Sequence, residues 1–151
     1  MLNVSIVLYR PDWEQVSALT HALLQSQRVN RVYWIDNSPQ TVEQLPLQSE
    51  RIQYQHNSTN LGYGAAHNIA IRESIYDNIP FHLVINPDII LDTKELDRML
   101  DFVSQNPLVG SLMPEVTYPN GQLQYLCKLL PTPLDVFRRR FLPSSWIAQR
   151  N

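Results

Sequence analysis

The run of residues 81–88 limits most strongly what this chain can fold into, because it ends an apolar strand on an isolated carboxylate. Residues 81–86 read FHLVIN, a nearly continuous apolar run that is typical of a strand buried on both faces of a sheet. Pro87 has no N–H to donate, so strand pairing ends there. Asp88 is therefore expected at the carboxyl edge of the sheet, where open α/β sheets bind ligands. Taken alone, Asn86-Pro87-Asp88 is more typical of a simple turn, so the case for a ligand site depends on the rest of the chain.

Strand-like and helix-like patterns alternate over the first hundred residues. Strands are predicted at residues 3–9, 31–35, 51–55 and 81–86, and helices at 12–27, at 64–77 and after a capping box at 92–95. This order predicts βαβ units, and therefore an α/β fold with a mostly parallel sheet flanked by helices. The strand at 3–9 is expected to be central. The residues expected to face the sheet or the core from the second and third helices are Ala66, Ile69, Ala70, Ile75, Leu96, Met99, Leu100 and Val103.

The chain is less regular after residue 100, where six of its eleven prolines lie. A further strand is predicted at residues 108–113. A short β-hairpin follows, with arms near 115–118 and 122–126 and a turn at 119–122. The central pair of that turn, Asn120 and Gly121, favours a type I′ conformation.

Composition places the chain among ordinary globular proteins. Its 151 residues are 44% hydrophobic and 17% charged, enough for one domain with a real core. The formal net charge of −2 gives no bulk attraction to nucleic acid. The single cysteine, Cys127, excludes an internal disulfide and favours a reducing, cytoplasmic location. Neither a signal peptide nor an apolar run of about 20 residues is found in the sequence.

Three polar loops follow predicted strands and should share one edge of the sheet. They are the segments 36–38 (DNS), 60–64 (NLGYG) and 86–88 (NPD). Gly62 and Gly64 permit a tight turn and close backbone approach to a ligand. The helix that follows Gly64 directs free N–H groups at the same edge, which favours an anion. Together the three loops indicate a nucleotide site, with Asp88 as a ligand for a divalent cation that phosphate oxygens share.

At this point the chain resembles the family 2 glycosyltransferases of the GT-A fold, most closely their rhamnosyltransferase-like branch. The resemblance extends over about residues 3–91 and rests on segments in family order and at family-like spacing. These segments are 4–9 (VSIVLY), 35–38 (IDNS), 60–70 (NLGYGAAHNIA) and 85–88 (INPD). A weaker similarity continues through 130–133 (LPTP) and the three arginines at 138–140.

The resemblance implies a role for each matching position. Asp36 would accept a hydrogen bond from the imide N–H of uracil or thymine, a task that suits a group that can only accept. Tyr9 and Arg10 would border the base and the ribose. Asn60, Gly62 and Gly64 would lie beside the nucleotide and ribose.

The metal site would be formed at 86–88, where the family keeps an Asp-x-Asp motif. Asp88 matches the final aspartate and would hold Mg²⁺ or Mn²⁺ on the diphosphate. Position 86 is asparagine, and one carboxylate fewer suggests weaker metal binding.

Other polar residues have structural explanations. The segment 36–39 (DNSP) is as typical of a turn as of a binding loop. His67 is interpreted as a packing or supporting residue rather than a base, and His82, within a strand, as structural. Cys127 is a lone thiol without a partner pattern for nucleophilic chemistry.

The resemblance divides the chain into two parts. Residues 1–130 would be an incomplete nucleotide-sugar-binding domain, and 131–151 a basic and aromatic tail that starts a missing acceptor-binding region. The tail is either the start of a truncated region or a basic amphipathic segment at the inner face of a membrane. Apolar surface left uncovered near 108–113 would favour self-association.

The resemblance implies inverting transfer of a sugar, with rhamnose as the candidate, in surface polysaccharide synthesis. The partners would be a UDP- or dTDP-sugar donor and a saccharide or lipid-linked acceptor. The catalytic base is expected beyond Asn151, so the chain should bind donor and transfer sugar slowly or not at all. Glu115 is the acid in the right general area and matches no family motif. Two alternatives remain open: a non-catalytic sugar-nucleotide-binding module and a flavodoxin-like α/β interaction domain.

Overall fold

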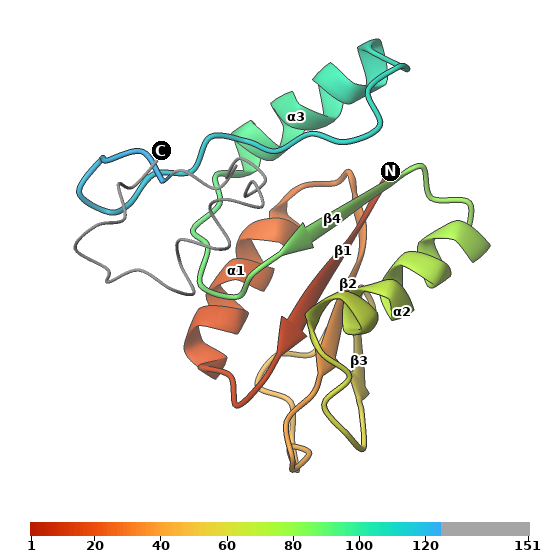
Figure 1. Ribbon diagram of the computed structural model, residues 1–151, viewed down its shortest axis with the longest axis vertical. Helices are drawn as coiled ribbons and strands as arrows, with labels where there is room; N and C mark the ends of the chain where they lie inside the picture. The colour runs from red at the N-terminus through yellow and green to blue at the C-terminus, as the bar shows by residue number, and fades with distance from the viewer. Residues whose placement is uncertain (125–151) are drawn as a thin grey trace, which may run out of the picture. The chain divides into compact units, whose positions relative to one another are not determined.

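The computed structural model describes residues 1–124, and the chain divides into one unit over Met1–Leu108 and a second from Val109. The first unit is built on a four-stranded parallel sheet in the order β3-β2-β1-β4 (Figure 1). The elements in chain order are β1 (Leu2–Leu8), α1 (Trp13–Gln25), β2 (Val29–Asp36), β3 (Ile52–His56), α2 (Tyr63–Tyr76), β4 (Phe81–Ile85) and α3 (Thr93–Gln105). The predicted α/β class, the parallel sheet and the central position of β1 are confirmed.

One face of the sheet carries the main apolar core, beneath α1 and α3. Alternate residues of β1 point to this face, because side chains in a strand alternate between the two sides. The first helix begins as predicted, since the Asp12 carboxylate accepts hydrogen bonds from the N–H groups of Glu14 and Gln15. The core is made of Leu2, Val4, Ile6, Leu8, Val16, Leu19, Leu23, Val29, Val32, Trp34, Ile85, Leu96 and Leu100.

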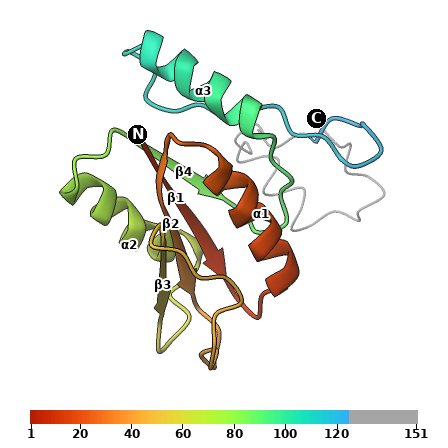
Figure 2. The ribbon, with the colours of Figure 1, turned by 180° about the vertical axis from the view of Figure 1, so that it is seen from behind.

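The opposite face is covered by α2, as the two views show together (Figures 1 and 2). Ala66 and Ala70 pack here against Tyr33 and Ile35, in a much smaller apolar cluster. The prediction that Ile75 faces the sheet is wrong, because this side chain is 71% exposed. The face instead buries polar residues of the helix, and these bond to polar residues of the strands below.

The prediction that the strand at 81–86 is buried on both faces is wrong for the residues that the structure describes. β4 pairs with β1 on one side and stands at the end of the strand order. Ile85 is buried against the core, but Val84, on the face of α2, is 42% exposed. The apolar run therefore predicts a strand of the sheet, but it does not predict the position of this strand in the strand order.

The second unit contains a hairpin turn, whose type differs from the prediction. Thr117 and Leu123 form an antiparallel bridge, and the Tyr118 N–H donates to the Gln122 carbonyl at 2.8 Å. Gly121 has φ of +81°, but Asn120 is not among the residues of positive φ, so the turn is not type I′. Instead the Gly121 N–H bonds to the Tyr118 carbonyl, as in a three-residue loop that closes on a left-handed glycine.

The predicted strand at 108–113 is absent: these residues are irregular in the structure. An apolar segment becomes a strand only where another strand pairs with it, and Leu108 is 100% exposed. Cys127, the end of the second hairpin arm and the predicted tail at 131–151 lie outside the described residues. Among residues 1–124, no helix has both the length and the apolar character needed to cross a membrane.

Candidate functional site

The carboxyl edge of the sheet gathers the segments that the sequence singled out. The register places Leu8 beside Asp36, and Asp36 beside His56, at the ends of β1, β2 and β3. All four strands run in the same direction, so the segments that follow them leave at this edge. The predicted convergence of the loops after β2, β3 and β4 is therefore confirmed.

The Asp36 carboxylate at this edge is held at both of its oxygens. The residue is fully buried, and each of its carboxylate oxygens accepts one hydrogen bond. Oδ1 accepts from the Ser38 N–H at 2.8 Å, and Oδ2 from the Tyr54 hydroxyl at 2.8 Å. A carboxylate offers about four lone-pair positions, so acceptor capacity remains for a ligand.

Ser38 connects three strand ends around Asp36. Its hydroxyl oxygen accepts from the Arg10 N–H at 2.7 Å, and its carbonyl accepts from His56 Nε2 at 2.8 Å. Arg10 has a φ of +49°, a left-handed conformation that is uncommon for a residue with a side chain. Such strain persists where the surroundings hold it, here by the bond to Ser38. The connection fixes the backbone on both sides of the carboxylate.

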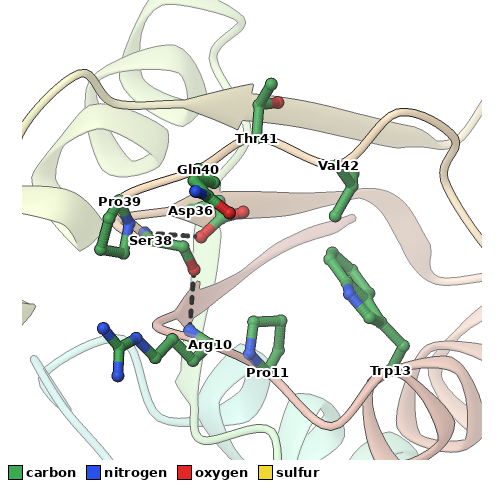
Figure 3. Close-up of a pocket in the computed structure, with 9 residues that line it drawn as sticks. All are labelled: Arg10, Pro11, Trp13, Asp36, Ser38, Pro39, Gln40, Thr41 and Val42. Atoms are coloured by element: carbon green, nitrogen blue, oxygen red, sulfur yellow. Dashed lines mark hydrogen bonds between the residues drawn. The ribbon is translucent and has the colours of Figure 1, made fainter.

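A pocket of about 580 Å³ opens beside Asp36 (Figure 3). It is lined by Arg10, Pro11, Trp13, Asp36, Ser38, Pro39, Gln40, Thr41 and Val42. The pocket thus brings together Arg10 and Asp36, two residues for which the resemblance implies roles at one base. Tyr9 does not line it; this residue is exposed, with its ring 5.7 Å from the Arg10 guanidinium carbon.

Tyr54 was not predicted as a residue of this site. It lies on β3, two positions before His56, on the face of the sheet where Asp36 also lies. Its ring packs against the main core, and its hydroxyl also lies 3.4 Å from the Thr41 hydroxyl. Burial, and to a smaller degree Asp36, raises the pKa of Tyr54, so its hydroxyl stays protonated and can donate at neutral pH.

The glycine loop forms the start of α2. Gly62 has a φ of +79°, so the turn needs a residue without a side chain, and the Asn60 side chain accepts from the Gly62 N–H at 2.9 Å. Gly64 lies within the helix, so the tight turn predicted there is wrong. A Cβ at either glycine would meet no described atom within 4 Å, which leaves open space beside both. Gly62 has no side chain to cap α2, so the first N–H groups of this helix make no bond to a capping side chain.

Tyr63 joins the glycine loop to the loop after β4. Its hydroxyl donates to Asn86 Oδ1 at 2.9 Å. Burial, followed by the negative charge of Asp88, raises the pKa of Tyr63. The sequence included Tyr63 in the glycine motif but predicted no role for it.

Asp88 is exposed and lies apart from the Asp36 pocket. It lines a second pocket of about 500 Å³, with Asp12 and Glu14 at the start of α1. The segment 10–14 contributes residues to both pockets, although no single residue lines both. In residues 1–124 no three histidine, cysteine or acidic side chains are grouped to hold a metal ion. A single carboxylate such as Asp88 fits a cation that takes most of its oxygen ligands from phosphate and water, as Mg²⁺ does.

A buried chain of polar side chains lies under α2. The Ser5 hydroxyl bonds to His67 Nδ1 at 2.7 Å and to His82 Nε2 at 2.8 Å, and Ser74 bonds to His82 Nδ1 at 2.7 Å. Burial lowers the pKa of His67 to about 4, and burial with the neighbouring His67 lowers the pKa of His82 to about 4. Both imidazoles are neutral at pH 7, which agrees with the structural interpretation of these histidines.

The model of the glycosyl transferase family 2 matches residues 19–133, about three quarters of the chain. The chain belongs to this family. A search among curated proteins found no match.

Two solved structures of S. aureus TarS share the fold. The structure of its residues 1–349 has 15% sequence identity and a TM-score of 0.52, covering 76% of this chain and 38% of that one. A longer TarS structure has 16% identity and a TM-score of 0.52, covering 77% and 25%. This likeness concerns the fold, and it agrees with the GT-A arrangement predicted from the sequence. The chain spans less than two fifths of either TarS structure.

Proposed function

We propose that the carboxyl edge of the sheet binds the nucleoside diphosphate of a UDP- or dTDP-sugar. The observation that carries this proposal is the buried Asp36 carboxylate beside a pocket at the end of β2. A fixed acceptor suits the imide N–H of uracil or thymine, whereas cytosine presents a lone pair at the same ring position. Arg10 and Trp13 line the same pocket and offer a cation and an aromatic face to the base. Tyr9 would border the ribose from outside the pocket.

The diphosphate would lie between the start of α2 and Asp88. Free N–H groups at a helix start favour an anion, and the space beside Gly62 and Gly64 lets a ligand approach the backbone. Asn60 would lie on the ribose side of this loop. Asp88 would hold Mg²⁺ or Mn²⁺, which when bound offsets the charge of the diphosphate as the sugar leaves.

We further propose that the chain serves transfer of a sugar to a saccharide or lipid-linked acceptor. Membership of the glycosyl transferase family 2 supports this over a flavodoxin-like interaction domain. Rhamnose and inversion at the anomeric carbon are the choices that the sequence resemblance favours. A non-catalytic binding module would bind the same donors, and an assay for transfer distinguishes the two.

Calorimetry with UDP, with and without Mn²⁺, tests the metal assignment. Asp88→Ala should remove most of the affinity that Mn²⁺ adds and leave metal-free UDP binding nearly unchanged, because only the carboxylate shared with the cation is lost. Asp77→Ala is the matched control: it removes the same charge after the far end of α2, where Asp77 pairs with Arg31 at 3.6 Å. If both variants keep the full gain from Mn²⁺, Asp88 is not the metal ligand.

A further inference from the structure

The orientation of the Asp36 carboxylate depends on a residue of the neighbouring strand. One of its two hydrogen bonds is local, from the Ser38 N–H within the turn after β2. The other comes across the sheet from the Tyr54 hydroxyl at 2.8 Å. The local bond restrains one oxygen, but the torsion about the Cβ–Cγ bond of an aspartate is broad, and a single hydrogen bond tolerates part of that range. The bond from Tyr54 holds the second oxygen and so fixes the plane of the carboxylate.

Tyr54 itself is held in place independently of this bond. Its ring packs against the main core, so its place does not depend on the hydroxyl. Asp36 pairs in register with His56, and Tyr54 stands two positions earlier on β3, at the diagonal distance that a long aromatic side chain can span. The packed ring therefore holds the Tyr54 hydroxyl, a single hydrogen-bond donor, at a fixed position beside Asp36.

We propose that Tyr54 is a positioning residue that determines which base the pocket accepts. By donating to one oxygen of Asp36, its hydroxyl turns the remaining lone pairs toward the pocket, where an imide N–H of uracil or thymine can use them. Cytosine has no N–H at that ring position, so a carboxylate held in this orientation repels it. This inference rests on the proposed binding of a pyrimidine nucleoside diphosphate and adds the residue that sets the selectivity.

Binding of UDP and CDP to wild type and Tyr54→Phe tests the proposal. Phenylalanine keeps the ring in the core and removes only the donor. Wild type should prefer UDP. In Tyr54→Phe the affinity for UDP should fall about tenfold and the affinity for CDP should change little, so that the ratio between them narrows by a similar factor. Tyr33→Phe is the control: its ring is buried, more deeply than that of Tyr54 and on the opposite face of β2, and the ratio should stay at the wild-type value.

The outcomes separate this inference from the function on which it rests. If wild type prefers UDP and Tyr54→Phe keeps the same ratio, or loses both ligands equally, Tyr54 does not set the selectivity and the proposed site stands. If wild type binds neither UDP nor dTDP, both are wrong. A ligand-free measurement adds a second check: the ¹³C resonance of the Asp36 carboxyl carbon should shift in Tyr54→Phe and stay in place in Tyr33→Phe. An unchanged resonance in Tyr54→Phe would also overturn the positioning role.

Discussion

A single buried carboxylate organises the candidate site at the scale of the residue. Removing a charged group from water is costly unless hydrogen bonds replace those it made to water. Asp36 meets this requirement with one bond to each oxygen, from Ser38 and from Tyr54. The carboxylate thereby lies at the wall of a pocket, where the proposed base would use its remaining acceptor capacity.

Replacing Asp36 should weaken nucleotide binding selectively. Asp36→Ala is expected to cost about 1–3 kcal/mol of binding free energy for UDP, because the imide N–H of the base is left unpaired. This corresponds to roughly 5–150-fold in the dissociation constant by calorimetry. CDP, which lacks that N–H, should lose much less.

The same substitution leaves the Tyr54 hydroxyl without its acceptor, so the fold must be checked alongside. A thermal unfolding midpoint well above the temperature of the binding experiment establishes that the variant is folded. Equal losses for UDP and CDP in a folded Asp36→Ala protein would count against a role in selecting the base.

The sequence predicted Asp36 but not Tyr54, for a physical reason. Asp36 follows an unbroken β-rich run, so its place at a strand end follows from the chain itself. Tyr54 reaches it only through the register of β2 against β3, which the irregular residues between them do not determine. The bond between Tyr63 and Asn86 was not predicted either, because it depends on how the start of α2 packs beside the loop after β4.

At the scale of the element, the start of α2 and its buried side have different surroundings. Its start faces the carboxyl edge, and its buried side lies on a chain of neutral histidines and serines. His67 belongs to both regions, since its ring packs edge-on against Tyr63 with centroids 4.3 Å apart. The polar side explains why the apolar periodicity of this helix is weak and why Ile75 could be assigned to the wrong face.

The histidine chain predicts that stability falls in mild acid. In the folded state the pKa of His67 and of His82 is about 4, below the ordinary value of 6.5 that applies after unfolding. The unfolded chain therefore takes up protons first as the pH falls, and the free energy of unfolding decreases between about pH 6.5 and about pH 4. Above about pH 6.5 this contribution is fully present.

Urea unfolding at about pH 7.5 and about pH 5 measures the effect. His67→Asn keeps a polar atom close to the position of Nδ1 but cannot titrate, so the difference between the two midpoints should become smaller than in wild type. His21→Asn, at an exposed histidine of α1, should keep the wild-type difference. An unchanged difference in His67→Asn would mean that other groups cause the loss in acid.

The bond between α2 and the loop after β4 predicts a milder effect on metal. Tyr63→Phe removes the hydroxyl that donates to Asn86, which loosens the segment that carries Asp88. One hydrogen bond contributes about 0.5–1.5 kcal/mol, so the affinity that Mn²⁺ adds to UDP binding should fall by roughly 2–10-fold. Tyr76→Phe, at an 82% exposed position on the same helix, is the control. Identical gains from Mn²⁺ in both variants would contradict a role for this bond.

At the scale of the whole first unit, the two edges of the sheet differ in character. The carboxyl edge holds two pockets, an uncapped helix start and an exposed carboxylate. At the amino edge, charged residues pair with one another, as in Arg28 with Asp101 and Arg31 with Asp77. The sequence predicted that polar loops gather at the carboxyl edge, because the direction of the strands follows from the alternation of strands and helices. It did not predict the ion pairs at the amino edge. The position of β4 at the end of the strand order could not be predicted, since an apolar run says nothing about its neighbours.

Mapping UDP by NMR tests the location of the site most directly. With UDP and Mg²⁺ added to the full chain, backbone amide resonances should shift at residues of the carboxyl edge: Arg10, Asp36, Ser38, Gly62 and Asp88. Resonances of Asn30 and Asn78, near the amino edge, should stay in place. Shifts confined to the amino edge, or no saturable shift at millimolar UDP, would contradict binding of a pyrimidine nucleotide at the carboxyl edge.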